Sequence, residues 1–315
     1  KWNRIALVVW GIEKERRRQL MGKKTVVFGS FVVDLMGRTP HLPAAGETVK
    51  GTVFKMGPGG KGFNQGVAAH KAGADVTMVT KLGRDSFADI ALNTMKDLGM
   101  KQDRILYSDD TETGCALIMV DENTSQNEIV VILGSCNTIS DAEVDSLEDL
   151  LDGSEYLLTQ LETNVSSVER IVDIACKKGV KVILNTAPIQ PISDELLSKV
   201  DLITPNEVEA EILTGVKVDS EEAADKAAEW FFHKGVKRVL ITLGGRGVYI
   251  NTRDKKGIIP AYKVNAIDTT GAGDAFNGGL LAALAEDKDI WDAADFANAL
   301  AALSVQKIGT TPSMP

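Results

Sequence analysis

Short apolar runs alternate with amphipathic stretches along most of the chain, and this pattern predicts a layered α/β fold. The apolar runs are rich in β-branched residues and typical of buried strands, at 25–28, 76–82, 156–161, 180–184, 202–204 and 239–242. Helical patterns cover 64–72, 87–98, 165–178, 207–213, 220–234, 272–285 and 290–307. Such alternation predicts a mostly parallel sheet with helices on both faces. Ligands of such sheets lie beyond the carboxyl ends of the strands.

Two early segments interrupt this alternation. Residues 31–56 and 113–132 are strand-like and irregular. Within the second segment, apolar runs at 115–120 and 129–133 flank a polar turn, which is typical of a hairpin. We therefore expect a small β substructure beside the main sheet.

The first twenty residues do not continue the pattern. The apolar run at 5–12 is far shorter than the ~20 residues of a membrane span. A basic run at 14–18 follows it, whereas a signal peptide carries its charge first. We interpret residues 1–20 as an N-terminal extension outside the fold, with a short surface helix as the alternative, and residues 21–315 as the folded domain.

The stretch at 265–279, NAIDTTGAGDAFNGG, carries the strongest chemical signal. It sets a turn of small residues, Gly271-Ala272-Gly273, before Asp274 and an apolar helix. A helix N-terminus offers free backbone N–H groups and the positive end of a dipole, so it binds an anion. A carboxylate at that point can take a proton from a nucleophile that arrives beside the anion. The pattern indicates phosphoryl transfer, with a glycine-rich turn capped by Asp274 as the alternative.

A second glycine-rich segment, GPGGKGFNQG, lies at 57–66. It fails the P-loop pattern because Lys61 is followed by Gly62 and not by Ser or Thr. Its glycines let the backbone approach a polar ligand closely.

These two segments resemble the signatures of the ribokinase-like (PfkB) family of sugar kinases, and most of all those of its ribokinase branch. Further matches follow in order at 46–48, 160–162, 204–209 and 242–247, so that the resemblance spans 24–314. It implies a three-layer α/β fold with a mostly parallel central sheet and a small β lid formed by 31–56 and 113–132. It also implies a last short helix beyond 309–313, so the chain is expected to be truncated at Pro315.

The resemblance implies an ATP-dependent phosphotransferase that acts on a primary hydroxyl of a small sugar, with D-ribose to D-ribose 5-phosphate as the expected reaction. Asp274 would be the catalytic base, and Gly271, Ala272 and Gly273 the anion cradle. The sugar contacts that it implies are Asp34, Gly60, Lys61, Asn64, Glu162 and Asp274. An ionised carboxylate such as Asp34 accepts hydrogen bonds from two neighbouring hydroxyls, which suits a diol.

One position departs from the family pattern. Many ribokinases carry Asn two residues before the sugar-binding aspartate, where it bonds a sugar hydroxyl. Here that residue is Val32. An apolar side chain cannot make that bond, which weakens ribose as the substrate without excluding it.

Asn206 and Glu209 stand one helical turn apart, so both side chains share one face. Their oxygens suit Mg²⁺, and the resemblance places them around the metal–phosphate site. The alternative is Asn206 as a plain N-cap beside a solvated Glu209. By the same resemblance the nucleotide contacts are Asn206, Thr242, Gly244, Gly245, Gly247, Gly273 and Asn298.

The resemblance also implies a monovalent-cation site for K⁺ beside the 271–274 turn. Its residues would be Asp268, Thr270, Ser304, Lys307, Gly309 and Ser313. Asp268 would supply charge, and Lys307 would serve only through its carbonyl oxygen.

Composition excludes several classes of protein. The hydrophobic share of 44% and the charged share of 25% are ordinary for a globular chain. A net charge of −9 argues against a nucleic-acid partner, although it permits a nucleotide. Three cysteines without a CxxC pair and three scattered histidines disfavour zinc sites and Ser-His-Asp triads. The resemblance implies a homodimer joined through the lid, with the sugar and ATP as partners. We expect it to be cytoplasmic, without a nucleic-acid or membrane partner.

Three other classes of protein share some of these sequence features. Another kinase of the family, a fructokinase or a nucleoside kinase, would keep the same chemistry. A non-catalytic sugar- or nucleotide-binding regulator would have no chemical need for Asp274. A dinucleotide-dependent oxidoreductase is disfavoured because 29–34 reads GSFVVD and lacks the Gly-x-Gly-x-x-Gly pattern.

Overall fold

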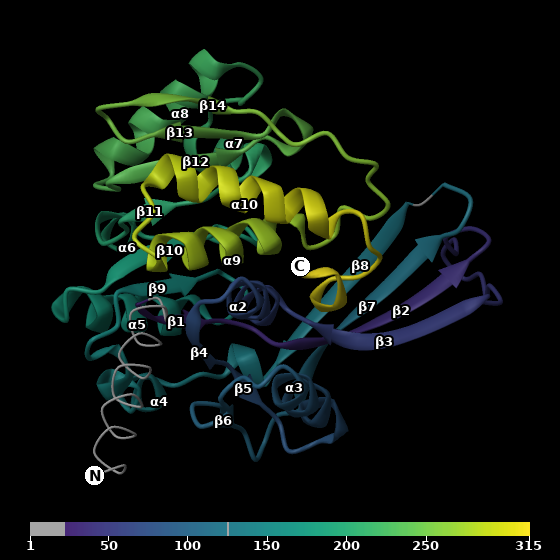
Figure 1. Ribbon diagram of the computed structural model, residues 1–315. Coiled ribbons are helices and arrows are strands. Elements are labelled where there is room, and N and C mark those ends of the chain that lie inside the picture. The colour runs from purple at the N-terminus through teal and green to yellow at the C-terminus, as the bar shows by residue number, and fades with distance from the viewer. Residues whose placement is uncertain (1–22, 125) are drawn as a thin grey trace, which may run out of the picture.

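A computed structural model describes residues 23–124 and 126–315 of the chain (Figure 1). The expected extension at 1–20 lies outside the described residues. No helix of the described part combines the length and the apolar character needed to cross a lipid bilayer.

An eight-stranded sheet forms the centre of the fold, in the order β14-β13-β12-β11-β10-β9-β1-β4. Its parallel strands are β1 (Lys24–Phe28), β4 (Asp75–Val79), β9 (Tyr156–Thr159), β10 (Lys181–Leu184), β11 (Leu202–Ile203) and β12 (Arg238–Thr242). The antiparallel edge strands β13 (Val248–Asn251) and β14 (Lys256–Ile259) were not expected from the sequence. The predicted run at 76–82 is divided between β4 and β5 (Lys81–Leu82), and β5 pairs with β6 (Leu106–Tyr107) in a separate two-stranded sheet.

Helices cover both faces of this sheet, as the alternation predicted. One face carries α2 (Lys61–Lys71), α3 (Ser86–Asp97), α9 (Ala272–Ala285) and α10 (Ile290–Ser304). The other carries α4 (Asp141–Asp145), α5 (Val165–Lys177), α6 (Asp194–Ser198), α7 (Glu207–Thr214) and α8 (Glu221–His233). The two-residue period of a strand divides the core: Val27 packs with the first group of helices, and Val26 and Phe28 with the second. The short helices α4 and α6 were not expected, and α10 ends before the predicted 307.

Short 3₁₀ turns complete the described part of the chain. They are η1 (Ser135–Asn137), η2 (Glu148–Leu151), η3 (Gly244–Arg246) and η4 (Thr311–Ser313).

A smaller sheet extends to one side of the helices, in the order β3-β2-β7-β8 (Figure 1). Its strands are β2 (Val32–Thr39), β3 (Val53–Gly59), β7 (Thr113–Asp121) and β8 (Asn127–Gly134). They come from the two segments that interrupt the alternation, and the expected hairpin is β7–β8. Asp34, Met36 and Arg38 alternate along one face of β2 and line a cavity. The fold class expected from the sequence is therefore confirmed.

Close packing of α2 against α9 brings two distant motifs together. Gly278 of α9 lies so near α2 that a Cβ there would be 2.5 Å from Ala68 Cβ and 2.6 Å from the carbonyl oxygen of Gln65. At the start of α2, a Cβ on Gly62 would be 2.5 Å from the carbonyl carbon of Gly29. Glycine at both positions allows backbones to approach where any side chain would clash. The first turns of α2 and α9 consequently share one site.

Candidate active site

The N-terminus of α9 opens onto the site. Gly271 begins the helix at φ 79°, a left-handed conformation that favours glycine. The N–H of Ala272 donates to the carbonyl oxygen of Thr269 at 3.2 Å. Among the described residues, the N–H groups of Gly273 and Asp274 have no acceptor. These two N–H groups, at the positive end of the helix dipole, form an anion site.

Asp274 lies at this helix start and is buried, 6% exposed. Its Oδ1 accepts a hydrogen bond from Gln65 Nε2 at 2.9 Å, and its Oδ2 accepts one from Asn64 Nδ2 at 3.0 Å. Burial raises the pKa of Asp274 above its ordinary value, while the charge of Lys61 and the two amide donors oppose that rise. The result is a carboxylate of increased basicity whose position is fixed from both sides.

Lys61 begins α2 and brings a positive charge to the same place. Burial alone would lower the pKa of Lys61, but the carboxylates of Asp274, Glu162 and Glu209 raise it above its ordinary value. The ammonium group therefore stays protonated among three acids. Such a fixed cation stabilises negative charge on a transferring group.

Glu162 follows β9 and fixes the start of α2. Its Oε2 accepts hydrogen bonds from Ser30 Oγ at 2.6 Å and from the backbone N–H of Lys61 at 2.7 Å. Gly60, which precedes the helix, has φ 90°, and a Cβ there would be 2.8 Å from Phe31 Cα. This turn tolerates only glycine, in agreement with a close approach of backbone at the ligand site.

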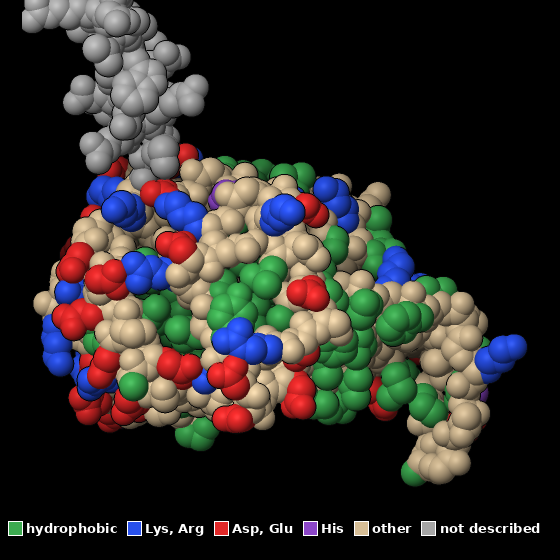
Figure 2. Space-filling model, turned by 90° about the horizontal axis from the view of Figure 1, so that it is seen from below, with side chains coloured by type: hydrophobic (Ala, Val, Ile, Leu, Met, Phe, Trp, Pro, Cys, Tyr) green, Lys and Arg blue, Asp and Glu red, His purple; other side chains and the backbone are tan. Residues whose placement is uncertain are grey.

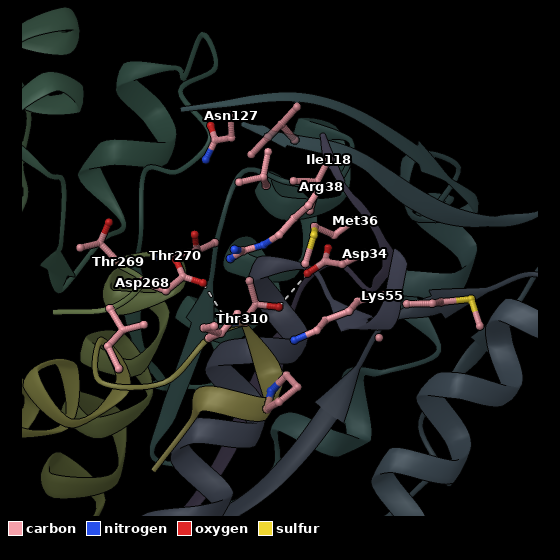
Figure 3. A pocket seen from close by; sticks show the side chains of 18 of the residues that line it. Asp34, Met36, Arg38, Lys55, Ile118, Asn127, Asp268, Thr269, Thr270 and Thr310 are labelled. Atoms are coloured by element: carbon pink, nitrogen blue, oxygen red, sulfur yellow. Dashed lines mark hydrogen bonds between the residues drawn. The ribbon is translucent and has the colours of Figure 1, made fainter. Parts of the chain in front are cut away.

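Asp34 lies on β2 and reaches the C-terminal segment. Its Oδ2 accepts a hydrogen bond from Thr310 Oγ1 at 2.7 Å (Figure 3). Burial raises the pKa of Asp34 to about 6; the Thr310 hydroxyl opposes the rise, and the charges of Glu162 and Asp274 add to it. A Cβ on Gly59 would lie 2.3 Å from Asp34 Oδ1, so glycine makes room for this carboxylate.

Three cavities meet around these residues. The first, about 490 Å³, lies between the small sheet and the segments near 268 and 309; Figure 3 shows Asp34, Arg38, Lys55 and Asp268 around it. The second, about 790 Å³, is lined by all seven residues expected to contact the nucleotide: Asn206, Thr242, Gly244, Gly245, Gly247, Gly273 and Asn298. The third, about 170 Å³, is lined by Lys61, Glu209 and Asp274 among others. Thr269 lines all three, so the cavities adjoin at the start of α9.

Asn206 and Glu209 form a capping box at the start of α7. Glu209 N–H donates to Asn206 Oδ1 at 2.8 Å, and Glu209 Oε2 accepts from Asn206 N–H at 3.0 Å and from Thr186 Oγ1 at 2.9 Å. Asn206 is thus an N-cap, but Glu209 is buried and not solvated. No group of three or more acidic, His or Cys side chains suited to a metal occurs in the described residues. Asn206 Nδ2 also donates to Glu209 Oε1 at 2.8 Å, so these oxygens already accept hydrogen bonds, and their role toward Mg²⁺ stays a prediction.

Asp268 organises the expected cation segment. Its Oδ1 accepts from the N–H of Thr270 at 2.9 Å, and its Oδ2 from the N–H of Gly309 at 3.0 Å. Burial would raise the pKa of Asp268, but these backbone donors lower it below its ordinary value. Asp268, Thr270 and Gly309 line the first cavity, whereas Ser304, Lys307 and Ser313 line none of the three. The Lys307 N–H bonds the carbonyl oxygen of Ser304 at 3.1 Å, and Ser313 Oγ that of Thr310 at 2.8 Å. The K⁺ site stays a prediction.

Several polar residues of the site were not singled out from the sequence. They are Gln65, Gln160, Asn185, Thr269, Thr310 and Thr311. Gln65 stands beside Asn64 in the 57–66 motif, and that position is the available signal for it. Gln160, Thr269, Thr310 and Thr311 stand in the segments at 160–162, 265–279 and 309–313, whereas Asn185 is recognisable only by its contacts with distant segments.

The fold and the site together indicate an α/β phosphotransferase, with free backbone N–H groups at a helix start and a buried carboxylate where three cavities adjoin. Comparison with known proteins agrees. The model of the pfkB family of carbohydrate kinases matches residues 23–315, and the chain belongs to this family.

Individual relatives extend along almost the full chain. A ribokinase from Haemophilus influenzae is 44% identical over 295 residues, which cover 94% of this chain and 96% of that protein. A deoxyribokinase from Salmonella typhi is 37% identical, covering 92% of this chain and 94% of that protein. The structure of Arabidopsis thaliana ribokinase complexed with ribose and ATP matches with a TM-score of 0.85 and 30% identity, covering 94% of this chain and 96% of that one.

The raised pKa of Asp34 predicts a pH-dependent stability difference. Because the folded pKa, about 6, exceeds the ordinary 3.8, the ionised carboxylate destabilises the ligand-free fold. This effect is absent well below pH 4 and complete above pH 6. Asp34→Asn removes it, so the unfolding free energy of the variant minus that of the wild type should increase by roughly 1 kcal/mol from about pH 5 to about pH 8. Urea unfolding at several pH values measures this difference.

The exposed Asp110→Asn serves as the matched control for that measurement. A difference for Asp34→Asn that does not vary with pH would show that Asp34 is not held at a raised pKa.

Proposed function

We propose that this protein is an ATP-dependent kinase that transfers the γ-phosphoryl group to the primary hydroxyl of D-ribose and yields D-ribose 5-phosphate. The observation that carries the proposal is the buried Asp274 at the start of α9, where the cavities meet. The ribokinases among the relatives support ribose and ATP as the two substrates. We assign the sugar to the cavity beneath the small sheet and ATP to the cavity lined by η3 and α10.

Asp274 takes the proton from the sugar hydroxyl as its oxygen attacks the γ-phosphorus in line. The new bond joins the sugar oxygen to phosphorus, and the bond from phosphorus to the β,γ-bridging oxygen breaks, so that ADP leaves. The N–H groups of Gly273 and Asp274 and the ammonium of Lys61 stabilise the charge on the transferring group. Asp34, which lines the first cavity, would hold other hydroxyls together with Gly60, Asn64 and Glu162, which line none of the three cavities.

Asn206 and Glu209 would hold Mg²⁺, directly or through water. When bound, this ion supplies neutralisation of phosphate charge. K⁺ would lie at the segment organised by Asp268, next to the Gly271 turn. The hydrogen bonds that the N–H groups of Thr270 and Gly309 donate to Asp268 already order that segment, and this supports a modest activating role. We place the reaction in the cytoplasm, because all three cysteines are free thiols.

A second substrate, 2-deoxy-D-ribose, is favoured by Val32. Val32 stands two residues before Asp34 on β2, so the two side chains lie on the same side of that strand, and Val32 is buried. An apolar side chain there leaves one sugar hydroxyl without a hydrogen-bond partner. A sugar that lacks this hydroxyl therefore loses little binding free energy. The deoxyribokinase among the relatives makes this alternative concrete.

We also infer a homodimer through the outer face of the small sheet. Phe54, Leu117, Val130 and Ile132 project from the face opposite Asp34 and are 45–69% exposed. Figure 2 shows hydrophobic side chains gathered toward this side of the molecule. Exposed apolar patches of this kind mark protein contacts.

We expect a dimer in sedimentation equilibrium and a monomer for Val130→Lys; a monomeric wild type would contradict the inference.

Asp274→Asn should lower kcat by at least about 100-fold, because the variant cannot accept the proton. ATP affinity should change little, since the N–H groups of the α9 turn remain. Steady-state kinetics and equilibrium ATP binding measure the two quantities. Asp292→Asn, an exposed position on α10 that lines none of the three cavities, is the control for the loss of one negative charge. Turnover near the wild-type rate in Asp274→Asn would exclude Asp274 as the base.

ATP turnover against a panel of sugars tests the substrate. D-ribose, 2-deoxy-D-ribose, D-fructose and a nucleoside are compared with and without K⁺. We expect the highest kcat/KM for D-ribose, measurable turnover of 2-deoxy-D-ribose, and higher rates with K⁺ than with Na⁺. Val32→Asn should raise the preference for ribose over 2-deoxyribose by roughly 10-fold, the value of one added hydrogen bond. Absence of turnover on every sugar would favour a binding protein.

A further inference from the structure

A chain of buried carboxamides leads to Asp274 from the far side of the substrate cavities. Gln65 Nε2 donates to Asp274 Oδ1 at 2.9 Å and to Asn185 Oδ1 at 3.1 Å. Gln65 Oε1 accepts from Gln160 Nε2 at 2.7 Å. Asn185 Nδ2 donates to the backbone carbonyl of Thr204 at 2.9 Å. Gln65 is 0% exposed and Gln160 1% exposed, and neither lines any of the three cavities.

The contacts determine which way each amide points. A backbone carbonyl only accepts, so Asn185 turns its NH₂ group to Thr204 and its oxygen to Gln65. The two N–H bonds of Gln65 are then both used, one on Asn185 and one on Asp274, and its oxygen receives Gln160. A flipped Gln65 would set its oxygen against the oxygens of Asp274 and Asn185, and this repulsion is costly because Gln65 is fully buried.

The other oxygen of Asp274 is held differently. Asn64 Nδ2 donates to Oδ2 at 3.0 Å, and the oxygen of Asn64 receives the hydroxyl of Thr311 at 2.5 Å. Thr311 belongs to the C-terminal 3₁₀ turn η4, so this support comes from the segment that also contacts Asp34. The support at Oδ1, by contrast, comes from buried amides: Gln65 and Gln160 behind the cavities, and Asn185, which also lines the third cavity.

We propose that Gln65, oriented by Gln160 and Asn185, is a positioning residue. It holds the Asp274 carboxylate in one orientation and keeps its Oδ1 as a hydrogen-bond acceptor. The lone pairs that the amides do not use are then presented to the cavity, where a sugar hydroxyl would arrive. The inference rests on the proposed role of Asp274 as the base.

The charges around Asp274 set the direction of the expected pH effect. Lys61 of α2 favours the ionised carboxylate, whereas Glu162 after β9 and Asp34 of β2 oppose it. Glu209 of α7 acts on Lys61. The hydrogen bond from Gln65 lowers the pKa of Asp274 against the effect of burial. Loss of that bond raises the pKa, so the base is ionised only at higher pH.

The test is Gln65→Met, which keeps the length and loses the N–H donors. With D-ribose and Mg·ATP, kcat should fall roughly 10- to 100-fold, as expected for a misplaced base, and KM for either substrate should change less than about 3-fold. The acid limb of the kcat–pH profile should move to higher pH.

Gln160→Met, which touches Asp274 only through Gln65, should cause a smaller change in the same direction. The double variant should lose less than the product of the two single losses.

Asn251→Leu is the matched control, because it removes a buried amide, 2% exposed, from β13. It should leave the pH profile unchanged even if it lowers stability. A wild-type kcat and pH profile in Gln65→Met, or an equal loss at every pH with raised KM values, would overturn the positioning role. If Gln65→Met does not fold, the same measurements of kcat, KM and pH profile on Gln160→Met decide between the positioning role and its rejection. Wild-type turnover in Asp274→Asn would instead reject the base itself, and the positioning role with it.

Discussion

The close approach of α2 to α9 is the constraint on which the site depends. Gly278 removes the side chain that would separate the two helices, and Gly62 lets the start of α2 rest against the backbone after β1. A Cβ at either position would overlap other atoms at 2.5 Å, so the spacing cannot be kept with a larger residue. Lys61, Asn64 and Gln65 reach Asp274 only because the helices are this close.

This packing encloses charge that would be costly to bury alone. Lys61 lies among the carboxylates of Asp274, Glu162 and Glu209, and each acid has hydrogen-bond donors of its own. Buried ions are tolerated when they are paired and their remaining lone pairs are satisfied. The same desolvation raises the pKa of Asp274 and of Asp34, which are the proposed base and a proposed sugar contact. Stability and chemistry are therefore opposed at these positions.

The C-terminal segment closes the site against the small sheet. Thr310 bonds Asp34 of β2, Gly309 bonds Asp268 of the loop before α9, and Thr311 bonds Asn64 of α2. Three successive residues thus connect the proposed sugar cavity, the expected cation segment and the support of the proposed base. A movement of this segment would change the contacts at all three places. It would therefore affect the small sheet and the α9 turn together.

The sequence by itself determined what is local. Strand runs such as 25–28, helices such as 165–178, the helix start at 271–274 and the one-turn spacing of Asn206 and Glu209 follow from periodicity and backbone chemistry within a few residues. Motif resemblance extended this to the family and to the grouping of the nucleotide-cavity residues. The β13–β14 edge and the short helices α4 and α6 lack a strong local pattern, and the sequence did not indicate them. Only the tertiary structure decided that Glu209 is buried, that Asp34 meets Thr310, and that Gln65 supports Asp274 across 209 positions of sequence. The reason is physical: hydrophobic periodicity reports which face of an element is buried, whereas the partner of a buried polar group is set by how distant elements pack together.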